Sequence, residues 1–359
     1  MCKRNNIKKM VKYKIGVWGQ YGDGGKIADG QAVRTTIITK ELQMRYGNGN
    51  VGIVNTNGWK RNPFKFFVDS FKLVKNSQIV VIAPADNGYK VFVPLLLLFN
   101  QLYRRRLVHI VIGGFLPALL KAEPIYIKFE NKFSAIFVQT DNLKNDLEQL
   151  GVCNISILSN LKRLNTLPLE NLIKKEEQDV RVCVFSRINK EKGIEDAVEA
   201  VKIANDKIGR IAIKLDMFGL IQPGYEETLQ EIIKSNQGIV DYKGIVDYDK
   251  TVEKLSSYFA MMFPTYYYGE GFPGNVVDAY NSGLPIIATD WLYNKDVIVD
   301  GRNGILVPIK SPTKLADSLL MLYYDRDKHF SMIKNNLEDS RQYHPDIVLR
   351  EFYAFIDNI

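Results

Sequence analysis

Two acidic residues flank a glycine-rich turn in residues 269–290, GEGFPGNVVDAYNSGLPIIATD. Glu270 precedes the turn, and Asp278 follows it within a run that we expect to be helical. The first amides of a helix have no acceptor inside the helix, so a helix that opens from such a turn suits a diphosphate. The two carboxylates could accept hydrogen bonds from sugar hydroxyls beside that diphosphate. The stretch therefore indicates a site for a nucleotide sugar.

Two cations form a second candidate site in residues 185–193, FSRINKEKG. Arg187 follows a predicted buried strand, and Lys192 stands just before the helix expected from Gly193. A guanidinium can bind phosphate through two parallel bonds, and an ammonium adds a point charge, so the pair could neutralise a departing diphosphate. An isolated pair of this kind is more typical of solvated loop charges. The acidic motif that follows favours the diphosphate interpretation.

Glycine pairs after two predicted strands would let a ligand approach the backbone closely. Gly24 and Gly25 lie in residues 19–34, GQYGDGGKIADGQAVR, which match neither a P-loop nor the dinucleotide-binding glycine pattern. A surface turn explains this pair equally well. Gly113 and Gly114 end another predicted strand, which contains His109. A histidine inside a strand is more often a core or wall residue than a catalytic base.

Short apolar runs separated by amphipathic segments predict alternating strands and helices in both halves of the chain. The predicted strands are Tyr13–Gly19, Val51–Asn55, Gln78–Ala83, Val108–Gly113, Ala135–Gln139, Ile155–Leu158, Arg181–Phe185, Ala212–Phe218, Val240–Tyr242, Met261–Pro264, Ile286–Thr289 and Gly304–Val307. The predicted helices include Arg34–Arg45, Asp141–Leu150, Ile194–Lys207, Glu226–Ser235, Lys250–Leu255, Val276–Asn281, Thr313–Tyr324 and Phe330–Arg341. Continuous apolar strands are typical of parallel sheets that are covered on both faces.

This alternation predicts an α/β fold with two doubly wound, Rossmann-like domains that face each other across a cleft. We place the first domain in residues 1–165 and the second in residues 166–340, and we expect residues 341–359 to form a helix that could pack back on the first domain. The polar stretch Lys162–Asp179 is the expected linker. Ligands of such sheets bind at the carboxyl ends of the strands, so the cleft is the expected site.

Charge divides the chain into a basic first half and an acidic second half. Residues 1–170 carry 25 Lys and Arg against 11 Asp and Glu, a net of +14, and residues 171–359 carry 23 against 29, a net of −6. The basic half suggests an anionic partner, either nucleic acid or an acidic membrane surface. The chain has no zinc-finger or helix-turn-helix pattern and no aromatics interleaved on a recognisable platform, so we expect no nucleic acid.

Residues 90–106, KVFVPLLLLFNQLYRRR, place an apolar run beside three arginines. This segment could lie on an anionic membrane, with basic N-terminal residues adding to the attraction. Those residues are Lys3, Arg4, Lys8, Lys9 and Lys12. A buried domain helix with a solvated basic end is an equally good interpretation. The longest apolar run, Val91–Phe99, is too short to span a bilayer.

The three cysteines, Cys2, Cys153 and Cys183, lack the spacing of a metal site, and the N-terminus has no apolar segment typical of a signal peptide. We therefore expect a reducing, cytoplasmic compartment. If the basic half binds lipid, the expected place is peripheral, at the inner face of the membrane.

The order of these motifs resembles the GT-B glycosyltransferases of the large retaining family 4, which contains many bacterial polysaccharide enzymes. The pieces that carry the resemblance are Arg187 with Lys192-Gly193, Phe218-Gly219, Tyr242-Lys243-Gly244, Glu270-Gly271-Phe272-Pro273, Gly283-Leu284-Pro285-Ile286 and Asn303-Gly304-Ile305-Leu306-Val307. The pairs Gly24-Gly25 and Gly113-Gly114 and the run Val138-Gln139-Thr140 extend it more weakly through the first half. The chain departs from the family where Asp278 replaces a second glutamate.

The resemblance implies a role for each matching residue. Arg187 and Lys192 would hold the donor diphosphate, and Glu270 would contact the transferred sugar. The donor-binding set would further comprise Gly24, Gly25, Gly219, Gly271, Phe272, Gly274, Asn275 and Asp278, with the amides of Phe272, Gly274 and Asn275 on sugar or phosphate oxygens and Asp278 on the ribose. His109, Gly113 and Gly114 would form an acceptor or sugar wall. The shorter Asp278 side chain would need a closer helix or a bridging water.

The expected activity is a retaining transfer from a nucleotide sugar to a glycan acceptor, with a lipid-linked glycan of surface polysaccharide or glycoconjugate synthesis as the favoured acceptor. Arg187 and Lys192 could take the place of a divalent cation, so we expect neither a metal nor a cofactor. A sugar phosphorylase or nucleotide-sugar epimerase of the same fold is one alternative. A non-catalytic homologue, suggested by Asp278, is another.

Overall fold

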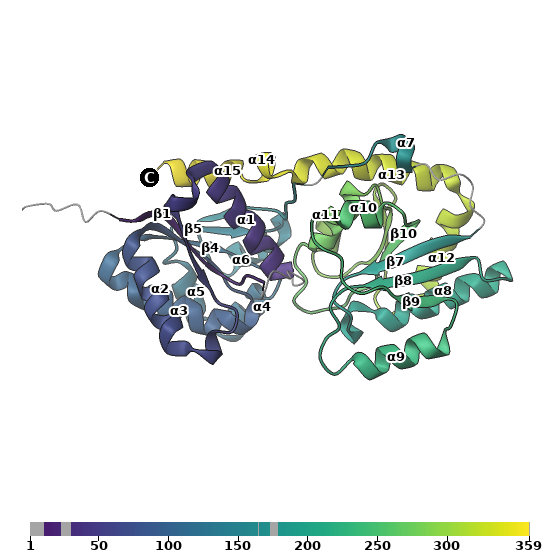
Figure 1. The fold of residues 1–359 in the computed structure, drawn as a ribbon, viewed down its shortest axis with the longest axis horizontal. Coiled ribbons are helices and arrows are strands. Elements are labelled where there is room, and N and C mark those ends of the chain that lie inside the picture. The colour runs from purple at the N-terminus through teal and green to yellow at the C-terminus, as the bar shows by residue number, and fades with distance from the viewer. Residues whose placement is uncertain (1–10, 23–29, 164, 173–178, 359) are drawn as a thin grey trace, which may run out of the picture.

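Two parallel sheets of six strands, one in each half of the chain, organise the computed structural model, which describes residues 11–22, 30–163, 165–172 and 179–358. The first sheet has the order β2-β1-β3-β4-β5-β6 and the second the order β12-β11-β10-β7-β8-β9. Figure 1 shows them as two lobes side by side, each with helices around its sheet. The predicted pair of doubly wound α/β domains is confirmed.

Strands and helices alternate along both lobes. The strands are β1 (Tyr13–Gly19), β2 (Val51–Asn55), β3 (Ser77–Ala83), β4 (Arg106–Ile110), β5 (Ala135–Val138), β6 (Ile155–Ile157), β7 (Val180–Phe185), β8 (Ile213–Phe218), β9 (Val240–Tyr242), β10 (Ala260–Phe263), β11 (Ile286–Thr289) and β12 (Gly304–Val307). The helices are α1 (Gly30–Tyr46), α2 (Pro63–Asn76), α3 (Asp86–Tyr103), α4 (Leu116–Ala122), α5 (Ile125–Glu130), α6 (Asp141–Gln149), α7 (Leu169–Leu172), α8 (Ile194–Ile208), α9 (Glu226–Ser235), α10 (Thr251–Leu255), α11 (Gly274–Asn281), α12 (Pro312–Tyr324), α13 (Arg326–Ser340), α14 (Pro345–Val348) and α15 (Arg350–Asp357).

The largest difference in strand bounds concerns β4, and helices α2, α4, α5 and α7 are missing from the predicted helices. The strand expected over Val108–Gly113 begins two residues earlier and ends at Ile110, because the chain leaves the sheet there to reach the cleft. Helix α2 is not among the predicted helices. Its start carries ordinary signals, since Asn62 accepts a hydrogen bond from the Lys65 amide and Pro63 stands at the first turn.

Helix α3 contains the apolar run Val91–Phe99. The sequence allowed this run either a membrane contact or a position in the core. Phe92, Val93 and Leu96 are buried in the core of the first lobe, against strand residues such as Val80 and Ile82. Pro94 lies inside the helix without ending it. One face of α3 is therefore a core face, while Leu98 and Leu102 on the same helix are exposed.

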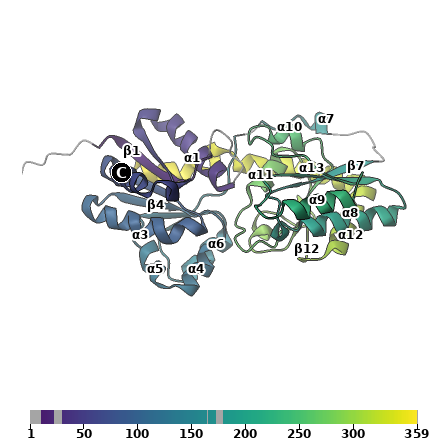
Figure 2. The same ribbon diagram turned by 60° about the horizontal axis from the view of Figure 1, so that its bottom comes forward.

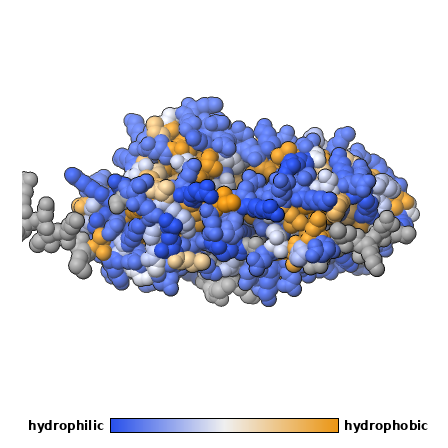
Figure 3. Space-filling view, turned by 90° about the horizontal axis from the view of Figure 1, so that it is seen from above, coloured by the Kyte–Doolittle hydropathy of each residue, from blue (hydrophilic) through white to orange (hydrophobic). Residues whose placement is uncertain are grey.

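The C-terminal helices return to the first lobe. Figures 1 and 2 show α13 along the second lobe, followed by α14 and α15 against the first. Leu349, Phe352 and Ile356 are buried in one cluster with residues of the first sheet, and Phe352 packs edge-to-face on Phe137 with ring centres 5.0 Å apart. The face over which these helices run is mainly hydrophilic, with small hydrophobic patches (Figure 3). Among the helices described, none is long and apolar enough to cross a bilayer.

Candidate active site

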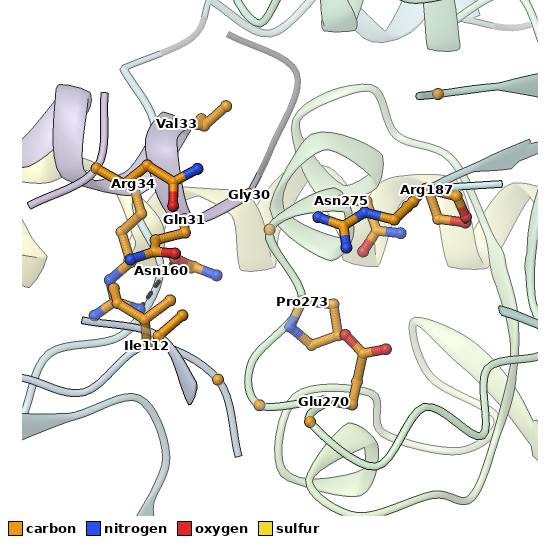
Figure 4. A pocket seen from close by; sticks show the side chains of 18 of the residues that line it. Gly30, Gln31, Val33, Arg34, Ile112, Asn160, Arg187, Glu270, Pro273 and Asn275 are labelled. Atoms are coloured by element: carbon orange, nitrogen blue, oxygen red, sulfur yellow. Dashed lines mark hydrogen bonds between the residues drawn. The ribbon is translucent and has the colours of Figure 1, made fainter. Parts of the chain in front are cut away.

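A cleft of about 810 Å³ lies between the lobes and is lined by both of them. Figure 4 shows Arg34, Asn160 and Ile112 on the side of the first lobe, facing Arg187, Asn275 and Glu270 on the other. The carboxyl ends of parallel strands open onto this space, as the fold requires. The predicted motifs around Arg187 and Glu270 are therefore brought into one cavity.

Glu270 and Lys192 form an ion pair inside the cleft. The Lys192 Nζ lies 2.5 Å from Glu270 Oε2, and the Thr265 hydroxyl donates to the same oxygen at 2.8 Å. Both charged side chains are largely withdrawn from solvent, at 13% and 9% exposure. The lysine therefore contacts the Glu270 carboxylate and could contact an entering phosphate at the same time. Thr265, buried beneath the glutamate, has no signal in the sequence that separates it from other strand-end threonines.

The loop that carries Arg187 and Lys192 is fixed by local contacts. Asn189 accepts a hydrogen bond from the Lys192 amide at 2.9 Å and closes a single 3-10 turn over Lys190–Lys192. Gly193 then starts α8 with φ of 72°, and a side chain there would meet the Pro264 carbonyl at 2.2 Å. Lys192 consequently stands on a turn with little freedom to shift, and Arg187 lies two residues after the carboxyl end of β7.

Gly219 explains how the ends of β7 and β8 come so close. Its φ is 139°, and a Cβ at this position would lie 1.8 Å from the Ser186 carbonyl oxygen. Gly219 borders the cleft together with Arg187 and Phe218. Glycine is thus required at position 219 for steric reasons, because only a residue without a Cβ lets the two strand-end loops touch.

The glycine turn leads into α11 as predicted, but its amides are not all available. The amides of Gly274 and Asn275 begin the helix, where no acceptor exists inside the helix. The Phe272 amide instead donates to Gln139 Oε1 at 3.3 Å, and the Phe272 ring packs on Tyr343 in the core. The expectation that the Phe272 amide contacts the ligand is therefore wrong for this arrangement.

Asp278 lies on α11 with an ion-pair partner that the sequence did not suggest. The carboxylate is buried and pairs with the Lys162 ammonium, and the Thr251 hydroxyl donates to the same oxygen, Oδ1, at 2.7 Å. Lys162, Thr251 and Asp278 all line the cleft. Lys162 belongs to the segment expected to be a linker, and a contact across 116 residues leaves no local pattern to find.

Gly113 and Gly114 bring the first lobe against the Glu270 turn. The Gly114 amide donates to the Gly269 carbonyl at 3.0 Å, and a Cβ on Gly114 would lie 2.2 Å from the Glu270 carbonyl oxygen. Gly271 has no room for a side chain either, because Gln139 Oε1 would lie 2.5 Å away. Gly113 borders the cleft. Gly114 is buried in this contact between backbones, so its assignment to a ligand wall is wrong.

His109 is a core residue. It is fully buried in β4, and its Nδ1 lies 2.9 Å from Glu130 Oε2. The Tyr89 hydroxyl donates to the same carboxylate, and the His109 ring packs beside Phe133. The side chain points into the helix layer of α3 and α5 rather than the cleft. Its assignment as an acceptor or sugar wall is therefore wrong, because alternate residues of a strand face opposite sides.

Arg34 and Asn160 line the cleft on the side of the first lobe, and neither is among the site residues predicted from the sequence. The Arg34 guanidinium donates to Asn160 Oδ1 at 3.1 Å and to the Leu158 carbonyl (Figure 4). Burial lowers the pKa of Arg34 to about 9. Asn160 in turn donates to the Phe272 carbonyl across the cleft at 2.5 Å. Gly24 and Gly25 lie outside the described residues.

Comparison with known proteins agrees with this arrangement. Residues 170–339 match the model of the family "Glycosyl transferases group 1". The second lobe belongs to the group 1 glycosyltransferases. The matched range contains the predicted sequence motifs of the second half, from Arg187 to the strand Gly304–Val307. The predicted family, enzyme class and GT-B fold are confirmed.

Two curated relatives that the chain resembles are named for the transfer of N-acetylated sugars. The chain is 24% identical over 271 residues to N,N'-diacetylbacillosaminyl-diphospho-undecaprenol alpha-1,3-N-acetylgalactosaminyltransferase of Campylobacter jejuni, covering 72% of this chain and 67% of the relative. It is 34% identical over 127 residues to the GtfA subunit of a UDP-N-acetylglucosamine–peptide N-acetylglucosaminyltransferase of Streptococcus pneumoniae. That match covers 35% of this chain and only 24% of the relative.

Solved structures share the fold over nearly the whole chain. HepE of Anabaena, crystallised with UDP and glucose, superposes with a TM-score of 0.75 at 14% identity, covering 97% of this chain and all of that one. TarM of S. aureus superposes with a TM-score of 0.66 at 19% identity, covering 81% of this chain and 59% of that one. At these identities the likeness establishes the fold, while the choice of substrate rests on the site.

Proposed function

We propose that this protein is a retaining glycosyltransferase that moves a sugar from a UDP-sugar to a lipid-linked glycan, without a metal ion. The observation that carries the proposal is the position of Arg187, Lys192 and Glu270 around one cleft that also receives the start of α11. Two cations and a helix start suit a diphosphate, and the adjacent carboxylate suits sugar hydroxyls. Crystallised HepE holds UDP and glucose, and this likeness supports uridine as the base.

The proposed chemistry is stabilisation of the leaving diphosphate. Arg187 and Lys192 would take up the charge that develops as the sugar–phosphate bond breaks, and the fixed turn at Asn189 keeps them in place. Glu270 would orient the sugar and hold the Lys192 ammonium between carboxylate and phosphate. The acceptor hydroxyl would attack from the face that the diphosphate leaves and pass its proton to the departing diphosphate oxygen, and the configuration of the sugar would be retained. The acceptor would enter from the first lobe, where Trp59, Lys60 and Arg61 border the cleft.

A donor screen tests this proposal. Thermal unfolding is followed with UDP-, GDP-, dTDP- and ADP-sugars at concentrations far above the expected Kd, with EDTA present. A donor at about 100 times its Kd stabilises the folded protein by roughly 2.7 kcal/mol, so UDP-sugars should stand out. Transfer is then measured with the stabilising donor and an undecaprenyl-diphosphate-linked sugar. Stabilisation by none of the four donor classes, or activity only with added metal, would contradict the proposal.

The lipid-linked acceptor is supported by a basic and apolar surface on α2 and α3. Phe64 and Phe67 are exposed at 78% and 45%, and Leu98 and Leu102 at 55% and 70%. The two helices are joined by the edge-to-face contact of Phe67 with Phe99. Exposed lysines, including Lys65, stand among them. An anionic membrane would attract the lysines and receive the apolar side chains. This surface replaces the buried face of α3 as the proposed membrane contact.

Sedimentation with vesicles tests the membrane contact. The wild-type protein should sediment with anionic phosphatidylglycerol vesicles at low salt and remain in solution with neutral phosphatidylcholine. The variant F64S/F67S should bind several-fold more weakly. The matched control is M44S, which removes an equally exposed apolar side chain from α1. Equal binding by F64S/F67S and wild type would exclude this surface.

A further inference from the structure

The buried pair of Lys162 and Asp278 is a feature of the cleft that the family pattern does not explain. Asp278 stands where the family has a longer glutamate, and its side chain is only 3% exposed. Lys162, at 9% exposure, extends from the first connection between the lobes to meet it. A buried carboxylate without a cation would be costly, so the lysine neutralises it. Neutralisation alone, however, does not require a position on the wall of the cleft, which both residues occupy.

The described hydrogen bonds of the Asp278 carboxylate leave one of its oxygens able to bind a ligand. Both described bonds end on Oδ1, one from the Lys162 ammonium and one from the Thr251 hydroxyl at 2.7 Å. The second oxygen, Oδ2, therefore keeps its ability to accept a proton from a hydroxyl. An ammonium has three N–H groups, of which the described ion pair uses one. The pair thus offers one acceptor and free donors side by side.

A vicinal diol complements this combination, because each hydroxyl can donate one hydrogen bond and accept another. We propose that Lys162 is a ribose-binding residue of the donor site, and that it makes up for the methylene that Asp278 lacks. Asp278 Oδ2 accepts from the 3′-hydroxyl, and the Lys162 ammonium donates to the 2′-oxygen. The inference rests on the proposed donor site and adds the residue that distinguishes ribose from deoxyribose.

The backbone around Lys162 keeps its side chain on this path. Leu158 and Leu161 are buried in the core of the first lobe, and the Lys162 amide donates to the Tyr343 carbonyl at 3.2 Å. Arg163 binds Glu41 and Asp346 on the opposite side. Residue 162 is thus tied to both chain connections between the lobes. Its side chain reaches the cleft from a fixed point rather than from a solvated loop.

Binding of UDP and 2′-deoxy-UDP by calorimetry tests the proposal, with GDP and 2′-deoxy-GDP as a second pair. The wild-type protein should prefer the ribonucleotide by about tenfold to a hundredfold, as expected for a hydrogen bond to a charged group. K162M should bind the ribonucleotide more weakly and retain less than about threefold preference. K162R should recover part of that preference. The matched control is K207M, which removes the lysine of a surface pair with Asp317 and should leave the preference unchanged.

The outcomes separate this proposal from the donor site itself. A folded K162M that keeps the wild-type preference, or that loses affinity equally for both nucleotides, would overturn the ribose contact while the donor site stands. Binding of neither pair by the wild-type protein would overturn both. Because K162M leaves a buried carboxylate unpaired and could unfold, K162Q serves as the second variant. Its amide can still donate to Asp278, but the side chain is one bond shorter than that of lysine and carries no charge, so it should show the same loss of preference.

Discussion

At the scale of single residues, the site depends on charges that are already paired before a ligand arrives. Lys192 contacts Glu270, and Lys162 contacts Asp278. An entering diphosphate or ribose therefore adds to existing ion pairs instead of ordering free side chains. Less conformational entropy is lost on binding when the charged groups are held in this way.

Replacing Glu270 tests the first pair. In E270Q the amide cannot balance the Lys192 charge and offers one acceptor oxygen where the carboxylate offers two, so transfer or donor hydrolysis should fall by about a hundredfold or more in kcat. The matched control is E191Q, which changes an exposed glutamate in the loop that also carries Arg187 and Lys192. This variant should retain wild-type kcat. A kcat for E270Q within about twofold of wild type would remove Glu270 from the site.

Site residues whose position is fixed by neighbouring turns could be predicted from the sequence. Site residues whose position is fixed by distant contacts could not. Arg187, Lys192 and Glu270 stand next to strand ends and turns that the sequence marks with glycine and proline. Lys162 and Gln139 contact residues more than a hundred positions away. The residues next to them in the sequence give no pattern that predicts those contacts. His109 was misassigned because a strand residue can face the core or the cleft, and its partner Glu130 lies on a helix 21 residues later.

At the scale of elements, close approach of the strand-end loops sets the shape of the donor site. Gly219 adopts φ of 139° and leaves no room for a Cβ beside the Ser186 carbonyl.

In G219A the loop carrying Arg187 must move away, because both the φ value and the contact oppose alanine. We expect the Kd for the nucleotide to rise at least tenfold. G224A, at another positive-φ glycine with open space around it, is the control for backbone strain alone. An unchanged Kd in G219A would show that the two loops need not touch.

Helix α15 is held to the first lobe by a charge cluster as well as by its apolar face. Asp357 binds Arg45, Tyr46 and Lys14, and the hydrogen bond from Arg45 is the main cause that lowers the pKa of Asp357 from 3.8 to about 2. A carboxylate with a lowered folded pKa stabilises the fold above its unfolded pKa and loses that effect as the pH falls through the folded pKa. The contribution of Asp357 is therefore present above about pH 4 and disappears towards pH 2.

Urea unfolding of D357N checks this. Because the group is exposed to solvent, the variant should lose only about 1 kcal/mol or less at pH 7. The difference from wild type should shrink between pH 4 and pH 2. A difference that is unchanged at pH 2 would mean that the side chain acts by packing rather than by its charge.

Most element types could be read from the sequence, and the exceptions have physical causes. Strands β1, β2, β11 and β12 match the predicted ranges residue for residue, because each is a short apolar run bounded by polar or glycine residues. Strand β4 was extended through Val111 and Ile112, which are apolar for packing after the strand has ended. Helix α3 was ambiguous because a helix buried on one broad face and a membrane-surface helix have similar composition.

At the scale of the whole molecule, the two lobes are joined by features that meet near the donor site. The connection at Lys162 and the returning chain at Tyr343 are hydrogen-bonded to each other, and α15 anchors the C-terminus on the first lobe. The contact of Gly114 with the Glu270 turn joins the backbones of the two lobes directly beside Glu270. The basic charge of the first half and the exposed α2 surface lie in the first lobe, the proposed acceptor side. The proposed function therefore assigns donor binding mainly to the second lobe and acceptor binding to the first.

The measurement that tests the central claim most directly is calorimetric titration of UDP into the wild-type protein and into R187A/K192A. If the cleft is a diphosphate site, the wild-type protein binds one UDP per chain and the double variant binds it at least a hundredfold more weakly while remaining folded. Equal affinity in the two proteins would contradict the account, because it would place the nucleotide away from Arg187 and Lys192.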